Sequence, residues 1–169
     1  MQWTKSIENL LDRVPLGKAR ETVLLRLFGL AKIPLLFLVS PKVLEVSEER
    51  CSIKIPLNRL TKNHLGSMYF GVLAIGADCA AGLIGMNFIR ASGRKVALIF
   101  KDFHADFIRR AEDDVIFTCD QGPAISDLVA RAVASGERVN LPVNIVACAA
   151  SDGEPVAKFI LTMSLKVKN

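Results

Sequence analysis

The segment from Gly66 to Arg90 constrains the fold more than any other part of the chain. It reads GSMYFGVLAIGADCAAGLIGMNFIR, and Asp78 is the single charged side chain between its two ends. A buried carboxylate without a partner is costly, so such a residue changes its pKa or is retained for a function. The pattern predicts a long apolar helix from about Ser67 to Ile89, in which Asp78 faces a cleft and not a dry core.

The length and hydropathy of Met68–Ile89 would also suit a membrane span. Its Gly and Ala content and its central carboxylate occur in packed transmembrane helices as well. The segments that follow, however, have the alternating pattern of amphipathic strands, and a single span placed between soluble strands makes little sense. We expect a buried helix and no stable membrane insertion, with a membrane-associated structural protein as the alternative.

Composition favours one soluble globular domain. The chain has 169 residues, 51% of them hydrophobic and 23% charged, which is enough to build a core and too apolar for disorder. The net charge of +5 comes from basic residues spread along the chain without a long run. This distribution predicts no nucleic-acid arm and would suit an anionic small molecule. The N-terminus lacks the layout of a signal peptide, so we expect a cytoplasmic protein.

The cysteines and histidines do not form a metal-binding pattern. No Cys-x-x-Cys pair occurs, and the chain contains only two histidines. We therefore expect no metal site, and reduced, buried thiols typical of the cytosol. The residues concerned are Cys51, Cys79, Cys119, Cys148, His64 and His104.

Apolar periodicity places the other elements. Helical spacing predicts helices over 5–16, 19–31 and 123–136, the last bracketed by Pro123 and Gly136. Alternation predicts strands over 42–57 (with a break around SEER), 96–109, 113–120, 139–147 and 157–167, with 57–66 as a polar loop. The order fits a single α+β domain over 1–169, in which a curved antiparallel sheet wraps around the apolar helix. Residues 1–40 would be a helical extension and 41–169 the core.

The layout of 41–169 and the start of the long helix resemble the hotdog-fold acyl thioesterases. The resemblance is greatest to the phenylacetate-pathway type and to a related, largely uncharacterised branch. The motif of that type is Asn-x-x-Gly-x-x-His-Gly-Gly, with a carboxylate nine residues after the His. Its positions fall in order on Asn63, Gly66, Tyr69, Phe70, Gly71 and Asp78. Tyr69 therefore stands in place of the family's His, and Phe70 in place of a Gly.

The resemblance implies catalytic roles for four of these residues. Asp78 would act as general base on water, or as nucleophile, against a thioester carbonyl. The amide of Phe70, next to Gly71, would hold the oxyanion, and Asn63 would orient the water or the loop. Considered without the resemblance, Asp78 would cap a backbone amide or pair with a lysine across a dimer interface. Gly71 would only permit tight packing.

The remaining site residues are expected to contact substrate. These are His64, Gly66 and Tyr69 near the helix start, and Arg94 and Lys95 as candidates for the phosphates of coenzyme A. His64 is as well explained by a role in stabilising the loop, Tyr69 by packing, and the two cations by ordinary surface charge. Coenzyme A would enter as part of the substrate, and no other cofactor is expected.

The resemblance predicts hydrolysis of an acyl thioester of coenzyme A or of an acyl carrier protein. It also implies a homodimer or a dimer of dimers, with each active site between subunits. The substitutions at Tyr69 and Phe70 leave an alternative open: a protein of the same fold that binds acyl-coenzyme A or fatty-acyl chains without hydrolysing them.

Overall fold

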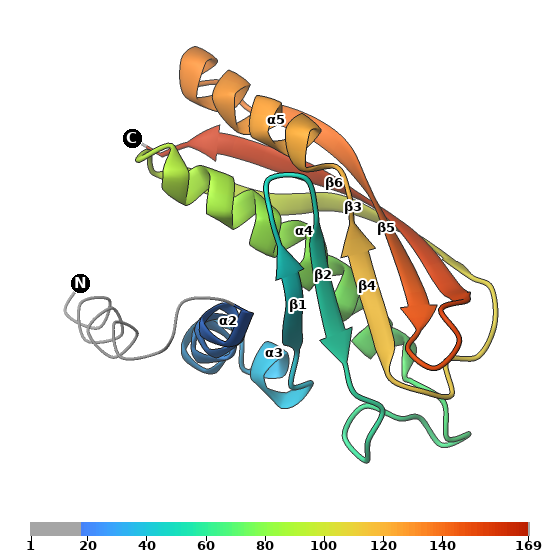
Figure 1. Cartoon of the computed structure of the whole chain (residues 1–169). Coiled ribbons are helices and arrows are strands. Elements are labelled where there is room, and N and C mark those ends of the chain that lie inside the picture. The colour runs from blue at the N-terminus through green and yellow to red at the C-terminus, as the bar shows by residue number, and fades with distance from the viewer. Residues whose placement is uncertain (1–17, 169) are drawn as a thin grey trace.

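The computed structural model describes residues 18–168, which form one antiparallel sheet with helices on one face and at one edge (Figure 1). The predicted helix over 5–16 lies outside the described residues. The elements are α2 (Lys18–Lys32), α3 (Pro34–Leu38), β1 (Lys42–Val46), β2 (Cys51–Ile55), α4 (Phe70–Ala91), β3 (Val96–Phe107), β4 (Val115–Cys119), α5 (Gly122–Ser135), β5 (Val139–Ala149) and β6 (Pro155–Val167).

The sheet has the strand order β1-β2-β4-β5-β6-β3, and every neighbouring pair is antiparallel. The break expected around SEER separates β1 from β2, because the N–H of Ser47 donates to the carbonyl of Arg50 at 2.9 Å and closes a turn. Gly136 ends α5 in the left-handed conformation with φ of 70°, as predicted for a C-terminal stop.

The apolar helix α4 lies across one face of the sheet (Figure 1). It is long and apolar enough to cross a membrane, yet more than half of its most apolar stretch is buried inside the domain. A side chain at Gly76 has no room, because the ring of the fully buried Phe117 fills the space beside it. The chain therefore uses α4 as the core helix of a soluble domain, as the sequence predicts.

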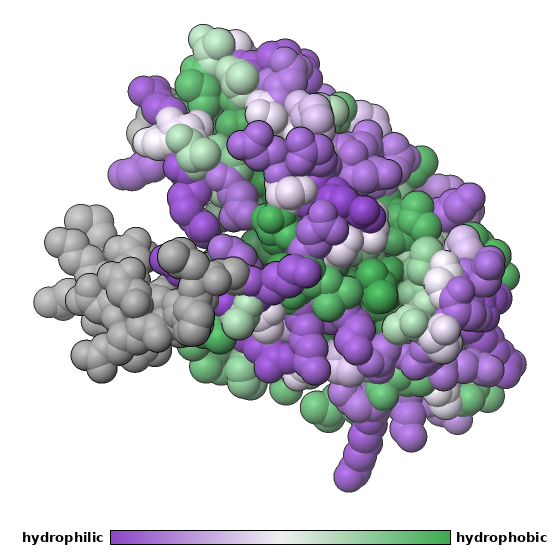
Figure 2. Space-filling model, viewed as in Figure 1, coloured by the Kyte–Doolittle hydropathy of each residue, from purple (hydrophilic) through white to green (hydrophobic). Residues whose placement is uncertain are grey.

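Helices α2 and α3 pack beside β1, at one edge of the sheet. The Arg26 guanidinium donates to the carbonyls of Ser40 and Pro41 at 3.1 Å each. The N–H of Val43 donates to the hydroxyl of Thr22 at 2.9 Å. Beyond these contacts the two helices expose much apolar surface, visible along the lower left of the molecule (Figure 2).

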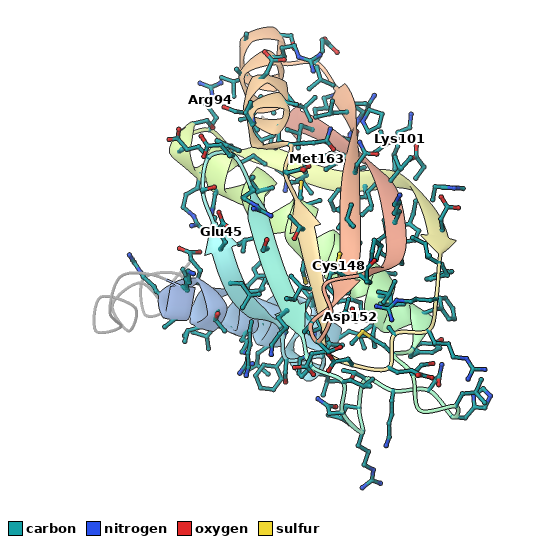
Figure 3. The ribbon with its side chains drawn as sticks, turned by 45° about the vertical axis from the view of Figure 1, so that its right-hand side comes forward. Glu45, Arg94, Lys101, Cys148, Asp152 and Met163 are labelled. Atoms are coloured by element: carbon teal, nitrogen blue, oxygen red, sulfur yellow. The ribbon has the colours of Figure 1, made fainter. Side chains whose placement is uncertain are left out.

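Strand register assigns the loops to two ends of the molecule. The end at which α3 leads into β1 also carries the loops 56–69, 108–114 and 150–154, since Ile55 pairs with Val115 and Val115 with Ala149. We call this the α3 end. Arg94 lies at the opposite end, where α4 turns back into β3, far from Asp152 of the α3 end (Figure 3).

Strand β3 forms the other edge of the sheet and pairs only with β6. It is 12 residues long and exposes Ile99, Phe103 and Phe107, each at about half of its surface. A long apolar edge strand is a template for pairing with a further strand. This edge is therefore suited to contact with a second chain.

Candidate functional site

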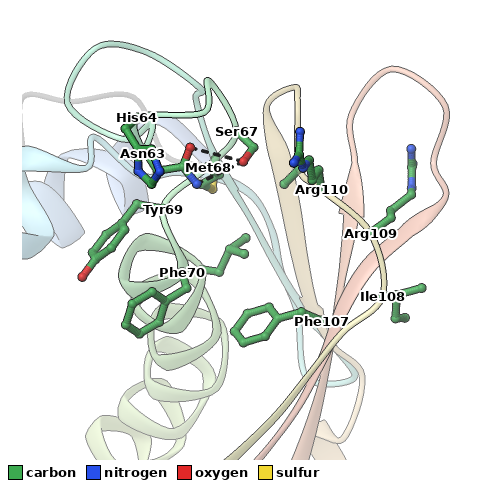
Figure 4. A pocket seen from close by; sticks show the side chains of 12 residues that line it. Asn63, His64, Ser67, Met68, Tyr69, Phe70, Phe107, Ile108, Arg109 and Arg110 are labelled. Atoms are coloured by element: carbon green, nitrogen blue, oxygen red, sulfur yellow. Dashed lines mark hydrogen bonds between the residues drawn. The ribbon is translucent and has the colours of Figure 1, made fainter.

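A groove of about 470 Å³ opens at the α3 end, between the start of α4 and the segment that follows β3 (Figure 4). Four predicted site residues line it: Asn63, His64, Tyr69 and Phe70. The opposite wall includes Phe107, whose ring faces that of Phe70 in Figure 4. The remaining lining residues are Ser67, Met68, Leu73, Ile108, Arg109, Arg110 and Ala111.

The first turn of α4 has no side-chain cap. Tyr69 occupies the N-cap position in extended conformation and makes no capping hydrogen bond, and the first turn contains no acidic residue. The N–H groups of Val72 and Leu73 donate to the carbonyl of Tyr69, whereas those of Phe70 and Gly71 have no acceptor among the described residues. Two unpaired donors at the positive end of a helix dipole make a favourable place for a negatively charged oxygen.

Asn63 holds the loop before α4 in shape. Its side-chain oxygen accepts from the N–H of Leu65 at 2.9 Å, and its amide nitrogen donates to the hydroxyl of Ser67 at 3.1 Å. Gly66 adopts φ of +85°, which an L-residue rarely adopts, and its N–H donates to the carbonyl of Asn63 at 3.1 Å. These contacts account for Asn63 and Gly66 as residues that shape the loop, and Gly66 does not line the groove.

The ring of Tyr69 lies beside the first turn of α4. Its centroid is 4.7 Å from that of Phe70, and a Cβ on Gly71 would come within 2.7 Å of its Cε1. Both rings are exposed, Tyr69 at 47% and Phe70 at 61%. Gly71 therefore makes room for the Tyr69 side chain here. His64 is also exposed at the rim of the groove.

Asp78 lies on the one stripe of α4 that the sheet does not cover. The stripe consists of the partly or well exposed residues Gly71, Ile75, Asp78, Gly82 and Met86. Because Asp78 follows Gly71 by seven residues, it has almost the same angular position, about 10 Å further along the helix axis. The carboxylate therefore lies on the same side of α4 as Gly71, whereas the N–H groups of Phe70 and Gly71 point along the helix axis from its first turn. The carboxylate and these N–H groups are too far apart to contact one carbonyl group.

The Asp78 carboxylate has no hydrogen-bond or ion-pair partner among residues 18–168. Burial alone raises its pKa above the ordinary value of 3.8. Considered without the resemblance, Asp78 was expected to cap a backbone amide or to pair with a lysine across a dimer interface. No such cap is found within the described chain. A partner for the carboxylate would have to come from outside it.

The two predicted phosphate contacts, Arg94 and Lys95, follow the C-terminal end of α4. A helix of 22 residues is about 33 Å long, so these cations are far from the groove of the same chain. The groove has two other arginines, Arg109 and Arg110, at the end of the strand predicted over 96–109, and neither was predicted as a site residue. Arg109 is bound to Asp152, with both carboxylate oxygens 2.8 Å from Nη2, while Arg110 has no carboxylate partner among the described residues.

Two adjacent arginines directly after a strand would have been the sequence signal for this site. That they meet the start of α4 depends on a contact between distant loops: the N–H of Met68 donates to the carbonyl of Ala111 at 2.7 Å. No group of three metal-ligating side chains occurs within the described part of the chain. The three cysteines within β2, β4 and α4 are buried, and burial raises the pKa of the Cys51 thiol to about 12.

Comparison with known proteins identifies the family. The family model for a domain of unknown function, DUF4442, matches residues 22–165, from α2 to the last strand. The chain belongs to the DUF4442 family. No curated protein matches this sequence.

Solved structures similar to this DUF4442 protein share its fold at low sequence identity. A Shewanella oneidensis protein proposed to be a thioesterase has a TM-score of 0.74 and 13% identity, and covers 89% of this chain and 99% of its own. A Pseudomonas aeruginosa protein of unknown function, also proposed to be a thioesterase, has a TM-score of 0.68 and 23% identity, with 91% and 98% covered. A thioesterase from Haemophilus influenzae has a TM-score of 0.61 and 13% identity, with 83% and 88% covered.

These structures confirm the expected α+β hotdog fold, with its antiparallel sheet around a central helix. The fold is shared with these thioesterases and proposed thioesterases. The closer resemblance to the phenylacetate-pathway type has no support among them and stays a prediction.

Proposed function

We propose that this DUF4442 protein hydrolyses acyl thioesters. One observation carries the proposal: α4 has both a carboxylate of raised pKa, Asp78, and the N–H groups of Phe70 and Gly71 at an uncapped start, and none of these groups has a partner among the described residues. A general base needs a carboxylate that is shielded and yet accessible, and acyl transfer needs donors aimed at the developing oxyanion. Both are present on α4, and neither is used for folding within the described chain.

In the proposed reaction, Asp78 takes a proton from water while the water oxygen attacks the thioester carbonyl carbon. The carbonyl oxygen becomes an oxyanion held by the N–H groups of Phe70 and Gly71. When the tetrahedral intermediate collapses, the C–S bond breaks, the thiolate leaves, and the proton returns to it. A thiolate is a good leaving group, so a carboxylate base suffices without a serine nucleophile.

We propose that a homodimer completes the site. Within one chain, Asp78 lies about 10 Å along the helix from the first-turn amides, so the base and the oxyanion donors must come from different subunits. The exposed stripe of α4 and the apolar edge of β3 are surfaces that a second copy would cover. A two-fold axis that relates the two subunits would place Asp78 of each subunit against the first turn of its partner's α4.

Coenzyme A thioesters are the proposed substrates. Arg110 lines the groove and has no carboxylate partner within residues 18–168, so it is available for a phosphate in place of the distant Arg94 and Lys95. His64 stands at the same rim. The acyl chain would lie against Phe107 and Phe70. Thioesters of an acyl carrier protein are the alternative substrates. A cytoplasmic location is likewise kept as a prediction.

The test is thiol release from short, long and aromatic acyl-coenzyme A esters. Asp78→Asn should abolish turnover while leaving folding and oligomeric state unchanged. A second pair tests the oxyanion donor: Phe70→Pro removes the N–H, whereas Phe70→Ala removes the ring and keeps the N–H. Proline is well tolerated at the first position of a helix, and Tyr69 with φ of −66° and ψ of 136° already has the conformation required before proline.

Loss of one oxyanion donor typically costs about a hundredfold to a thousandfold in kcat, so Phe70→Pro should fall below Phe70→Ala by about that factor. Equal turnover in wild type and Asp78→Asn would remove Asp78 from the mechanism. Equal turnover in Phe70→Pro and Phe70→Ala would show that the Phe70 N–H does not stabilise the oxyanion.

The second candidate is a binder of acyl-coenzyme A that does not hydrolyse it. It is favoured by the Tyr69 ring, which takes the space beside Gly71 where a substrate would approach the helix start. Thermal stabilisation by acyl-coenzyme A without thiol release would support it.

A further inference from the structure

The hairpin formed by the end of α2 and by α3 carries an unusual amount of exposed apolar surface. Six of the eleven residues 28–38 are large apolar side chains exposed at between 41% and 56% of their surface. They are Phe28, Leu30, Ile33, Leu35, Phe37 and Leu38, and we call them the apolar tip. Within this stretch only Gly29 and Leu36 are buried, so the hairpin is apolar on several sides and not along one groove. Soluble proteins rarely leave such a patch without a partner.

The segments that form the apolar tip and the neighbouring loop carry basic and no acidic side chains. Residues 22–44 and 56–69 contain no Asp or Glu, whereas Lys32, Lys42, Arg59 and Lys62 are all exposed. The second of these segments is the loop of the α3 end, and it also exposes Leu60 and Leu65. The acidic residues of this end belong to the loops 108–114 and 150–154, where Asp114 is paired with Lys54 and Asp152 with Arg109. A basic, apolar surface complements an anionic membrane.

The position of the apolar tip also separates it from the proposed dimer contact. It adjoins β1, while the proposed dimer uses β3 and the exposed stripe of α4, and β1 and β3 are the two opposite edges of the sheet. In that dimer the apolar tip would remain exposed. The groove beside α4 opens at the same α3 end, so a protein held by this end would present the groove to the surface that holds it.

We propose that the apolar tip, with the basic residues around it, is a docking surface for anionic phospholipid bilayers. The tip enters the interfacial region, Lys32, Arg59 and Lys62 contact lipid phosphates, and α4 stays inside the domain. Docking at the α3 end gives the groove access to amphiphilic thioesters that partition into the bilayer. This last consequence rests on the proposed thioesterase function, whereas docking itself does not.

The test is flotation of the full chain with vesicles of phosphatidylcholine and phosphatidylglycerol in a 3:1 ratio, compared with pure phosphatidylcholine. Leu35→Ser combined with Phe37→Ser removes apolar surface from exposed positions of the tip. Val146→Ser combined with Ile160→Ser is the matched control, because these side chains are exposed at 38% and 39% on strands away from the tip. Asp78→Asn is included to separate docking from turnover. Circular dichroism and light scattering verify folding and oligomeric state.

We expect wild type, the control pair and Asp78→Asn to float with the anionic vesicles, and much less with pure phosphatidylcholine. The tip variant should lose at least about tenfold in the vesicle-bound fraction with an unchanged oligomeric state. The proposal is overturned if wild type fails to float with either vesicle, or if the tip variant floats like the control. It is also overturned if the tip variant changes the oligomeric state, since a second copy would then be what covers the tip.

Discussion

Replacement of Gly76 by Ala tests how closely α4 approaches the sheet, and with it the direction in which Asp78 points. A Cβ on Gly76 would lie 2.6 Å from Cδ2 of Phe117 and closer still to its Cε2 and Cζ. Phe117 is fully buried on β4 and has no space into which to retreat. Overpacking of this kind costs about 1–3 kcal/mol, and the upper part of that range applies to a rigid ring. Alanine restores about 1 kcal/mol of helix propensity, which leaves a net loss of about 2 kcal/mol.

A double-mutant cycle separates this contact from other effects of the substitution. In a Phe117→Leu background the ring is gone, so Gly76→Ala should become neutral or stabilising, with a coupling free energy of about 2–3 kcal/mol. The measurement is urea unfolding of the four proteins at equal concentration, followed by fluorescence and circular dichroism with unchanged m-values. A Gly76→Ala protein as stable as wild type, or an equal loss in both backgrounds, would refute the packing that orients α4.

Four further predictions concern the site and the proposed dimer. Because burial raises the pKa of Asp78 above 3.8 and the base must be ionised, kcat/KM should fall as pH falls through that raised pKa, and the pH–rate profile measures it. The folded state binds the proton of the Asp78 carboxyl group more tightly than the unfolded state does, so the folded state loses stability as pH rises through the same range. Asp78→Asn should therefore raise the melting temperature at pH 7. Ile99→Asp combined with Phe103→Asp should convert the proposed dimer to monomers in light scattering. An unchanged mass would exclude the β3 edge as part of the dimer interface. Arg110→Ala should raise KM for acyl-coenzyme A about tenfold or more, with a smaller effect from Arg109→Ala, whose guanidinium is bound to Asp152.

The architecture was predictable because the periodicities are strong and local. Alternating residues along β5 and β6 define a hairpin with one buried face, and the apolar run of α4 admits only a core helix or a span. The position of Asp78 on a stripe that the sheet does not cover follows from the same helical geometry, but Asp78 does not line the groove at the start of α4.

Features that depend on long-range contacts were not predictable. The pairing of β4 with both β2 and β5 brings Arg109 and Arg110 to the start of α4, and no local pattern indicates that meeting. The ring of Tyr69 beside Gly71 depends on a side-chain rotamer. The exposure of the apolar tip was not predictable either, because a segment such as IPLLFLV is apolar enough to belong to a core and only the structure shows its side chains at the surface.

The most direct test of the central claim is activity from hybrid dimers of two inactive variants. Subunits carrying Asp78→Asn and subunits carrying Phe70→Pro are co-refolded in equal amounts, and thiol release from acyl-coenzyme A is compared with that of each variant alone. If each site combines Asp78 of one subunit with the Phe70 amide of the other, every hybrid regains one intact site. Random pairing then predicts about a quarter of wild-type activity. A mixture that stays as inactive as the separate variants, although the hybrids form, would contradict a shared site built from Asp78 and the start of α4.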